Sequence, residues 1–325
     1  MFSTKSLVLW LCIISVSAAV LPAQEARLSG PISGWVFDGA THSLRPIIGM
    51  PGASYLGDPL VAGLDWAAVA PEGNQALALR AGNLYAVRGL EGNPAWTLIE
   101  NGLPSPGRIA WNASASVAVL SSSAESRLQF VRNLGEGPVA GAPIDLPGRV
   151  LALALDRAGE RAVVGIEAEQ EGGLYLVSQA EPPRLLARLG RPAAIALAAN
   201  DRDLFVADRA SRQIWEFRNF RQEATPLLFA EDGSGDSDAV GLALSRDGRL
   251  LFVASQSGKT LDAYALESRS LFSRSALDYE PSLLEPLSGR VLFLLKSSGN
   301  GREPLLVLDT SREPTVYFVP VGRGE

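Results

Sequence analysis

Few side chains in this sequence are of the types that carry out catalysis. His42 is the only histidine, and it falls in a predicted turn at 39–42. A Ser–His–Asp relay would need this residue, and the chain contains no Gly-x-Ser-x-Gly motif that would supply its nucleophile. The only cysteine, Cys12, lies near the N-terminus. We therefore interpret His42 as a surface residue and assign no catalytic residues.

One acidic cluster could bind a metal ion. Asp232, Asp236 and Asp238 lie in a loop that is rich in glycine and serine. Carboxylate oxygens in a flexible loop can serve as Ca²⁺ ligands, although this spacing does not match an EF-hand. The same composition is also typical of a solvated polar turn. Calcium therefore stays open as a cofactor, and no other cofactor is expected.

Three charged residues recur at corresponding places in the sequence. Arg149, Arg191 and Asp238 each lie ten residues before a tight turn that precedes a strongly apolar segment. If the fold brings these places together, the side chains can receive an anionic or polar ligand. The alternative is that they are ordinary turn residues. The elements that position them decide between the two interpretations.

Those elements are short strands in a repeat. Apolar residues alternate with polar ones in short segments that are separated by Gly, Pro, Asn, Asp and Ser, which is typical of an all-β fold. The tight turns that precede the most apolar segments lie 41, 45, 42, 47 and 41 residues apart. They begin at Gly73, Ser114, Gly159, Asp201, Gly248 and Gly289.

The repeat predicts a β-propeller of four-stranded blades. Each unit of about 42 residues holds a strand of small residues, two apolar strands and a more polar fourth strand, which is the pattern of a propeller blade. Six complete units run from 64 to 322. A hairpin at 35–50 resembles the third and fourth strands of a further unit. We therefore expect seven blades with an incomplete first blade, and a six-bladed ring is the alternative.

Two units resemble known propeller repeats. The segment 203–217 is similar to an NHL repeat, with Asp208, Arg212 and Ile214 at the places of its characteristic residues. The segment 240–266 resembles a YVTN repeat in its turn at 245–248, its strand at 252–255 and its loop at 257–260. The resemblance implies the propeller fold. Relatives include binding scaffolds, matrix-like proteins and some calcium-dependent sugar lactonases, so it implies no single activity.

The N-terminus has the pattern of a secretory signal peptide. Lys5 is the only charged residue among the first 23, and an apolar run leads to small residues at 17–19. We expect residues 1–23 to be a signal peptide and residues 24–325 to form one propeller domain. The mature chain would then be periplasmic or extracellular, without a cysteine and without a transmembrane segment.

Composition narrows the class of partner. The net charge is −6 at pH 7 and no cluster of basic residues is present in the sequence, which argues against a nucleic-acid partner. The sequence favours a monomeric, non-enzymatic binding or scaffolding propeller that presents loops to a protein or glycan. The alternative is a calcium-dependent, lactonase-like hydrolase that uses the mouth of the channel.

Overall fold

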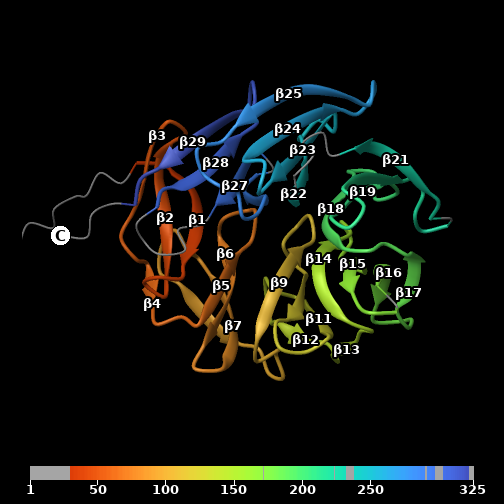
Figure 1. Ribbon diagram of the computed structural model, residues 1–325. Helices are drawn as coiled ribbons and strands as arrows, with labels where there is room; N and C mark the ends of the chain where they lie inside the picture. The colour runs from red at the N-terminus through yellow and green to blue at the C-terminus, as the bar shows by residue number, and fades with distance from the viewer. Residues whose placement is uncertain are drawn as a thin grey trace, which may run out of the picture.

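The protein is a ring of seven β-sheets (Figure 1). The computed structural model describes residues 30–170, 172–222, 224–231, 238–289, 291–296 and 303–321, and the regular structure of these residues is entirely β. None of them forms a helix long and apolar enough to cross a membrane. The expected seven-bladed β-propeller is confirmed, and the six-bladed alternative is wrong.

The innermost strand of each blade borders a central channel. Small side chains such as Ala152, Ala194 and Ala243 are buried there, because neighbouring blades approach closely at the centre of the ring. The innermost strands are β1 (Ile32–Asp38), β5 (Trp66–Val69), β9 (Pro106–Trp111), β14 (Arg149–Leu155), β18 (Pro192–Leu197), β22 (Ala239–Leu244) and β26 (Glu285–Ser288).

The second and third strands of the blades form the most buried layer. In blades two to seven, these are β6 (Gln75–Arg80), β7 (Asn83–Arg88), β10 (Ala118–Ser122), β11 (Arg127–Arg132), β15 (Arg161–Glu167), β16 (Gly173–Ser178), β19 (Leu204–Asp208), β20 (Gln213–Phe217), β23 (Leu250–Ser255), β24 (Thr260–Ala265), β27 (Leu292–Lys296) and β28 (Leu305–Asp309). Their apolar side chains form cores shared by adjacent blades. Phe130 of blade three packs with Val164 of blade four, for example. Such shared burial is the main stabilising contribution in a ring of sheets.

The outer strands are more exposed and less regular. They are β8 (Ala95–Leu98), the pair β12 (Val139–Ala140) and β13 (Ile144–Asp145), β17 (Arg184–Ala187), β21 (Pro226–Glu231), β25 (Ser270–Ala276) and β29 (Thr315–Val319). In blade three the outer strand is interrupted, so that both β12 and β13 pair with β11. The outer strands do not reach the channel.

Blade one departs from the expected arrangement. The sequence pattern predicts that the hairpin of β1 and β2 (Ser43–Met50) supplies a third and a fourth strand, and this placement is wrong. β1 lies between the inner strands β5 and β26, so the hairpin supplies the first and second strands. β3 (Ala53–Leu56) and β4 (Val61–Ala62) then pair along the same edge of β2 as two parts of one interrupted strand.

The direction of blade one is also reversed. β4 lies beside Ser43 and Leu44, next to the turn between β1 and β2. The backbone N–H of Leu64 donates to the carbonyl of His42 at 3.0 Å, and β5 begins at Trp66. The β1–β2 turn therefore lies at the end of the ring where β5 begins, and β1 runs opposite to β5.

The ring closes between the first and last blades, which lie side by side in red and dark blue in Figure 1. Val36 and Ile47 of blade one share a core with Leu305 and Val307 of blade seven. The N–H of Leu56 donates to the carbonyl of Pro320 at 3.1 Å, and a parallel bridge follows at Val321. Closure therefore rests on packing and a short parallel contact, while each blade keeps its own sheet.

Candidate functional site

The seven inner strands enclose a channel of about 950 Å³. Its wall is largely apolar, with alanine, valine, leucine and isoleucine from every blade. The indole side chains of Trp66 and Trp111 are half-buried and form part of the wall, and Trp35 of blade one lines it as well. Glu285 is the only carboxylate among the described residues that line the channel. The wall is therefore suited to apolar contact rather than to acid–base chemistry.

Arginines gather at one mouth of this channel, the end where the inner strands of blades four to seven begin. Arg149 is the first residue of β14, and Arg191 directly precedes β18. Arg209 follows β19, whose last residue pairs with Pro192 at the start of β18. Arg108 lies near the start of β9. We call Arg108, Arg149, Arg191 and Arg209 the mouth arginines.

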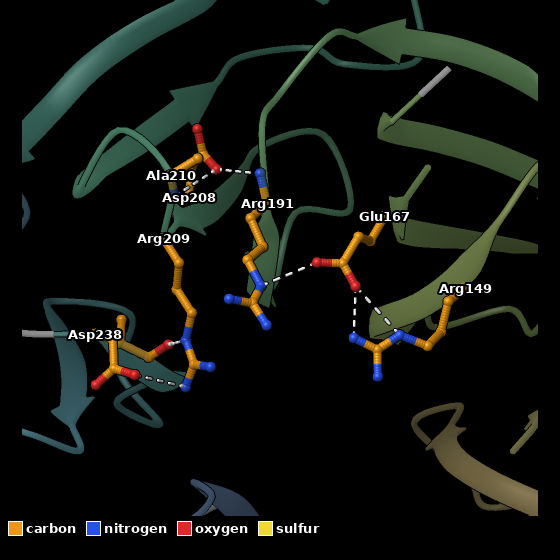
Figure 2. A network of polar contacts seen from close by, with 8 residues as sticks. Arg149, Glu167, Arg191, Asp208, Arg209, Ala210 and Asp238 are labelled. Carbon is orange, nitrogen blue, oxygen red and sulfur yellow. Dashed lines mark hydrogen bonds and ion pairs between the residues drawn. The ribbon is translucent and has the colours of Figure 1, made fainter. Parts of the chain in front are cut away.

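A single carboxylate connects two of the mouth arginines. Glu167, the last residue of β15, accepts hydrogen bonds from Nε of Arg149 at 3.2 Å and from its Nη2. The other oxygen of Glu167 lies 3.1 Å from Nε of Arg191 (Figure 2). The hydrogen bonds from Arg149 and the charges of both arginines hold the pKa of Glu167 below its usual value. Glu167 therefore stays ionised and links blades four and five at the mouth.

Asp208 holds the backbone next to Arg191 and Arg209 in place. Its Oδ1 accepts hydrogen bonds from the N–H of Arg191 at 2.6 Å and of Ala210 at 3.3 Å (Figure 2). Its Oδ2 accepts one from the hydroxyl of Ser211 at 2.9 Å. The carboxylate is buried and binds mainly neighbouring backbone groups. Its role is to order the two loops that carry Arg191 and Arg209.

Arg209 is anchored to blade six. Its Nε donates to the carbonyl of Ala239 at 2.9 Å, and its Nη2 lies 3.6 Å from Oδ2 of Asp238. The N–H of Ser257 donates to the other Asp238 oxygen at 3.2 Å. Figure 2 shows the side chains of Arg149, Arg191 and Arg209, which come from three separate segments, pointing to the same side of the ribbon.

Arg108 differs from the other mouth arginines because its guanidinium has no hydrogen-bond or ion-pair partner among the described residues. Partial burial, the largest cause, lowers its pKa, and repulsion from Arg209 and Arg149 lowers it further. The negative charge of Glu285 opposes this shift. A guanidinium nevertheless remains protonated in proteins. The site therefore contains a permanent positive charge that lacks a direct counter-ion.

Glu285 lines the channel, where the residue is exposed. Desolvation by the surrounding protein raises the pKa of its carboxyl group, and the positive charge of Arg108 partly offsets the rise. Glu285 makes no hydrogen bond or ion pair with another described residue, so it is not a direct counter-ion of Arg108.

A small pocket opens among these arginines. Its volume is about 70 Å³, and its lining includes Arg108, Arg191, Arg209 and Ser282. Arginine side chains can bind a carboxylate, phosphate or sulfate group through paired N–H donors. The pocket and the channel share Arg108, Ala193 and Val240 as lining residues, so the two spaces adjoin at the mouth.

The structure brings the three predicted site residues to one mouth. Arg149 and Arg191 meet through Glu167, and Asp238 reaches Arg209. Counting ten residues back from each tight turn did not identify Arg108, Arg209 or Glu285. His42 is exposed, as expected, and its Nδ1 lies 3.0 Å from the carbonyl oxygen of Leu64.

The structure gives limited information on the predicted metal cluster. Asp232 and Asp236 lie outside the described residues. The carboxylate of Asp238 is engaged by Arg209 and by the N–H of Ser257. In the described part of the chain, no three His, Cys, Asp or Glu side chains gather in a way that could hold a metal ion.

Comparisons with known proteins give the fold and no family. No family model matches the chain, and neither does any curated protein. A functionally unknown protein from Desulfotomaculum acetoxidans DSM 771 is similar in structure, with a TM-score of 0.63 and 14% identity over 89% of this chain and 99% of that one. Kluyveromyces lactis Hsv2 matches with a TM-score of 0.53 and 12% identity over 76% of this chain and 74% of that one. A chain of a nidogen/laminin complex matches with a TM-score of 0.51 and 12% identity over 73% of this chain and 91% of that one. Identities this low establish the propeller fold alone.

Proposed function

We propose that the protein is an exported, non-enzymatic binding propeller whose channel mouth binds an acidic group on a protein or glycan partner. The observation that carries the proposal is the guanidinium of Arg108, which lies among other arginines without a direct counter-ion. Loops on a rigid scaffold are the usual places for such recognition.

An acidic ligand group would satisfy Arg108 directly. The guanidinium carries five N–H donors in a planar fork that matches the two oxygens of a carboxylate. Arg149, Arg191 and Arg209 already have partners, whereas Arg108 interacts only at longer range with Glu285. A bound anion would therefore replace the missing counter-ion and offset the repulsion among the arginines.

The same mouth offers little support for hydrolysis. A calcium-dependent lactonase would need several oxygen ligands for Ca²⁺ at the mouth. Among the described residues that line the channel, Glu285 has no second carboxylate beside it. A calcium ion at the mouth would be repelled by the neighbouring arginines, and Asp238 already interacts with Arg209. The lactonase-like alternative is therefore not favoured.

We also predict that the protein is exported, that its repeats are of the NHL or YVTN type, and that it is a monomer. The signal-peptide pattern of residues 1–23 supports a periplasmic or extracellular location. The NHL-like and YVTN-like segments coincide with regular strands of blades five and six. We expect a monomer without a nucleic-acid partner.

Acidic and neutral probes would test the proposal. Purified protein from residue 24 onward is applied to an array of uronate-bearing and sulfated glycans, acidic peptides and their neutral counterparts. We expect salt-sensitive binding to acidic probes that is lost in Arg108→Ala and kept in Arg312→Ala, a control at an exposed turn. The proposal would be overturned if Arg108→Ala bound the acidic probes as well as the wild type does. It would also be overturned if the protein chemically converted a bound probe.

A further inference from the structure

The channel beneath the mouth arginines is a cavity whose role the proposed function leaves open. It extends from the mouth, at Arg108 and Glu285, to the turns at the opposite end, where Asn200 and Arg246 line it. Its volume lies in the range of small-molecule binding sites, roughly 300–1,000 Å³. Such sites are mostly apolar with a few fixed polar groups, which is the composition found here.

We propose that this channel binds the apolar body of an amphipathic carboxylate, a fatty acid of about 8 to 12 carbons or longer, whose head group is held by Arg108 at the mouth. This inference rests on the proposed function, because it assigns a chemical class to the acidic group. The small pocket would hold the carboxylate, and the apolar channel would hold the chain.

The polarity of the two connected spaces supports an amphipathic ligand. The lining of the small pocket includes Arg108, Arg191, Arg209 and Ser282. The channel is lined mainly by aliphatic and aromatic side chains. Both spaces share Arg108, Ala193 and Val240, so they adjoin, and a ligand whose head group lies in the pocket has its chain next to the channel.

The indole groups favour an apolar occupant over water alone. Trp66 and Trp111 come from neighbouring blades and are half-buried, with part of each side chain facing the channel. An alkyl chain that covers these surfaces removes them from water, which is the main driving force for apolar binding. Each buried methylene contributes enough to strengthen affinity by roughly fourfold.

The experiment is a titration with a series of saturated fatty acids. Acetate, octanoate, decanoate and dodecanoate are titrated at concentrations below micelle formation, and binding is followed by calorimetry and by tryptophan fluorescence. We expect affinity to rise with each two-carbon step and the tryptophan emission to shift as the channel fills. Dodecanol, which has the chain without the charge, should bind at least tenfold more weakly than dodecanoate.

Two variants separate the head-group site from the channel. Arg108→Ala should raise the Kd for dodecanoate about tenfold or more, while Arg312→Ala should leave it unchanged. Ala154→Trp places a large side chain in the channel wall and should abolish the dependence on chain length. Ala40→Trp, at an exposed turn, serves as its control. Thermal unfolding of all four variants shows whether each remains folded.

The possible results distinguish the two proposals. If acidic array probes bind through Arg108 but dodecanoate binds no better than acetate, the channel proposal is wrong and the proposed function stands. If Arg108→Ala changes neither array binding nor dodecanoate affinity, both proposals are wrong. Chain-length-dependent binding that is sensitive to both Arg108→Ala and Ala154→Trp would establish the amphipathic site.

Discussion

Arg108 and Glu285 carry opposite charges at the same channel mouth and interact electrostatically without forming an ion pair. Arg108 lies on the inner strand of blade three, and Glu285 begins the inner strand of blade seven. Each shifts the pKa of the other toward the charged form, but neither shift cancels the effect of burial. The two groups therefore influence each other across the channel mouth without a direct contact.

The raised pKa of Glu285 predicts a measurable pH dependence of stability. Folding favours the protonated carboxyl group, so this stabilising contribution is complete below the unfolded value of 4.5 and is lost as pH rises through the folded pKa. Glu285→Gln removes the titration. We expect the variant to gain thermal stability relative to the wild type as pH rises from 4 to 8. A difference in Tm that does not vary with pH would contradict this assignment.

Glu167 competes with an anionic ligand for the mouth arginines. Its pKa is lowered mainly by hydrogen bonds from Arg149, which favour the ionised carboxylate. Glu167→Gln should therefore free Arg149 and Arg191 and lower the Kd for dodecanoate about two- to fivefold at pH 7. Calorimetry would measure the change. Glu181→Gln, at an exposed turn, should leave the Kd unchanged, and weaker binding by the Glu167 variant would show that this residue positions the arginines instead.

The propeller can be predicted from the sequence because its signals are local and repeated. A tight turn followed by an apolar strand recurs in six units, and each inner strand begins at nearly the same distance from the turn. That constant distance predicts that Arg149, Arg191 and Asp238 lie at one mouth of the ring. In the structure Arg149 begins β14, Arg191 directly precedes β18 and Asp238 directly precedes β22, while their binding role stays a prediction.

The features that the sequence did not reveal depend on long-range geometry. Arg209 reaches the mouth because the end of β19 pairs with the start of β18. The count of ten residues misses Arg108 because this residue lies only six residues before the turn at Ser114. The sequence pattern misplaces the hairpin of blade one because an inner and an outer hairpin share the same alternation. Its reversed direction has no local sequence signal.

Asp208 should be important for stability as well as for the shape of the mouth. Replacing it with alanine leaves the partly buried N–H of Arg191 without its 2.6 Å acceptor and removes the buried carboxylate that orders both loops. An unsatisfied buried group costs about 1–3 kcal/mol, and urea unfolding should show a loss of that size. Asp208→Asn keeps one oxygen acceptor and should lose less. Asp145→Ala, which removes only an exposed ion pair with Arg127, should cost less than about 1 kcal/mol.

The close approach of blades six and seven gives the sharpest test of the ring packing. Gly241 lies on β22, and a Cβ atom added there would stand 2.6 Å from the backbone nitrogen and 2.9 Å from the Cα of Leu284. Backbone atoms cannot move aside as a flexible side chain can, so the two blades would have to separate. Such overpacking costs about 1–3 kcal/mol.

Gly241→Ala should therefore lower the free energy of unfolding by about that amount, as measured by urea denaturation. Gly39→Ala is the matched control, because a Cβ atom at Gly39 would meet no atom within 4 Å. If both variants unfold at the same urea concentration as the wild type, the inner strands have room that the structure does not show. If only Gly241→Ala is destabilised, the small residues of the inner strands are required by contact between blades. That result would explain why alanine and glycine recur along the channel wall.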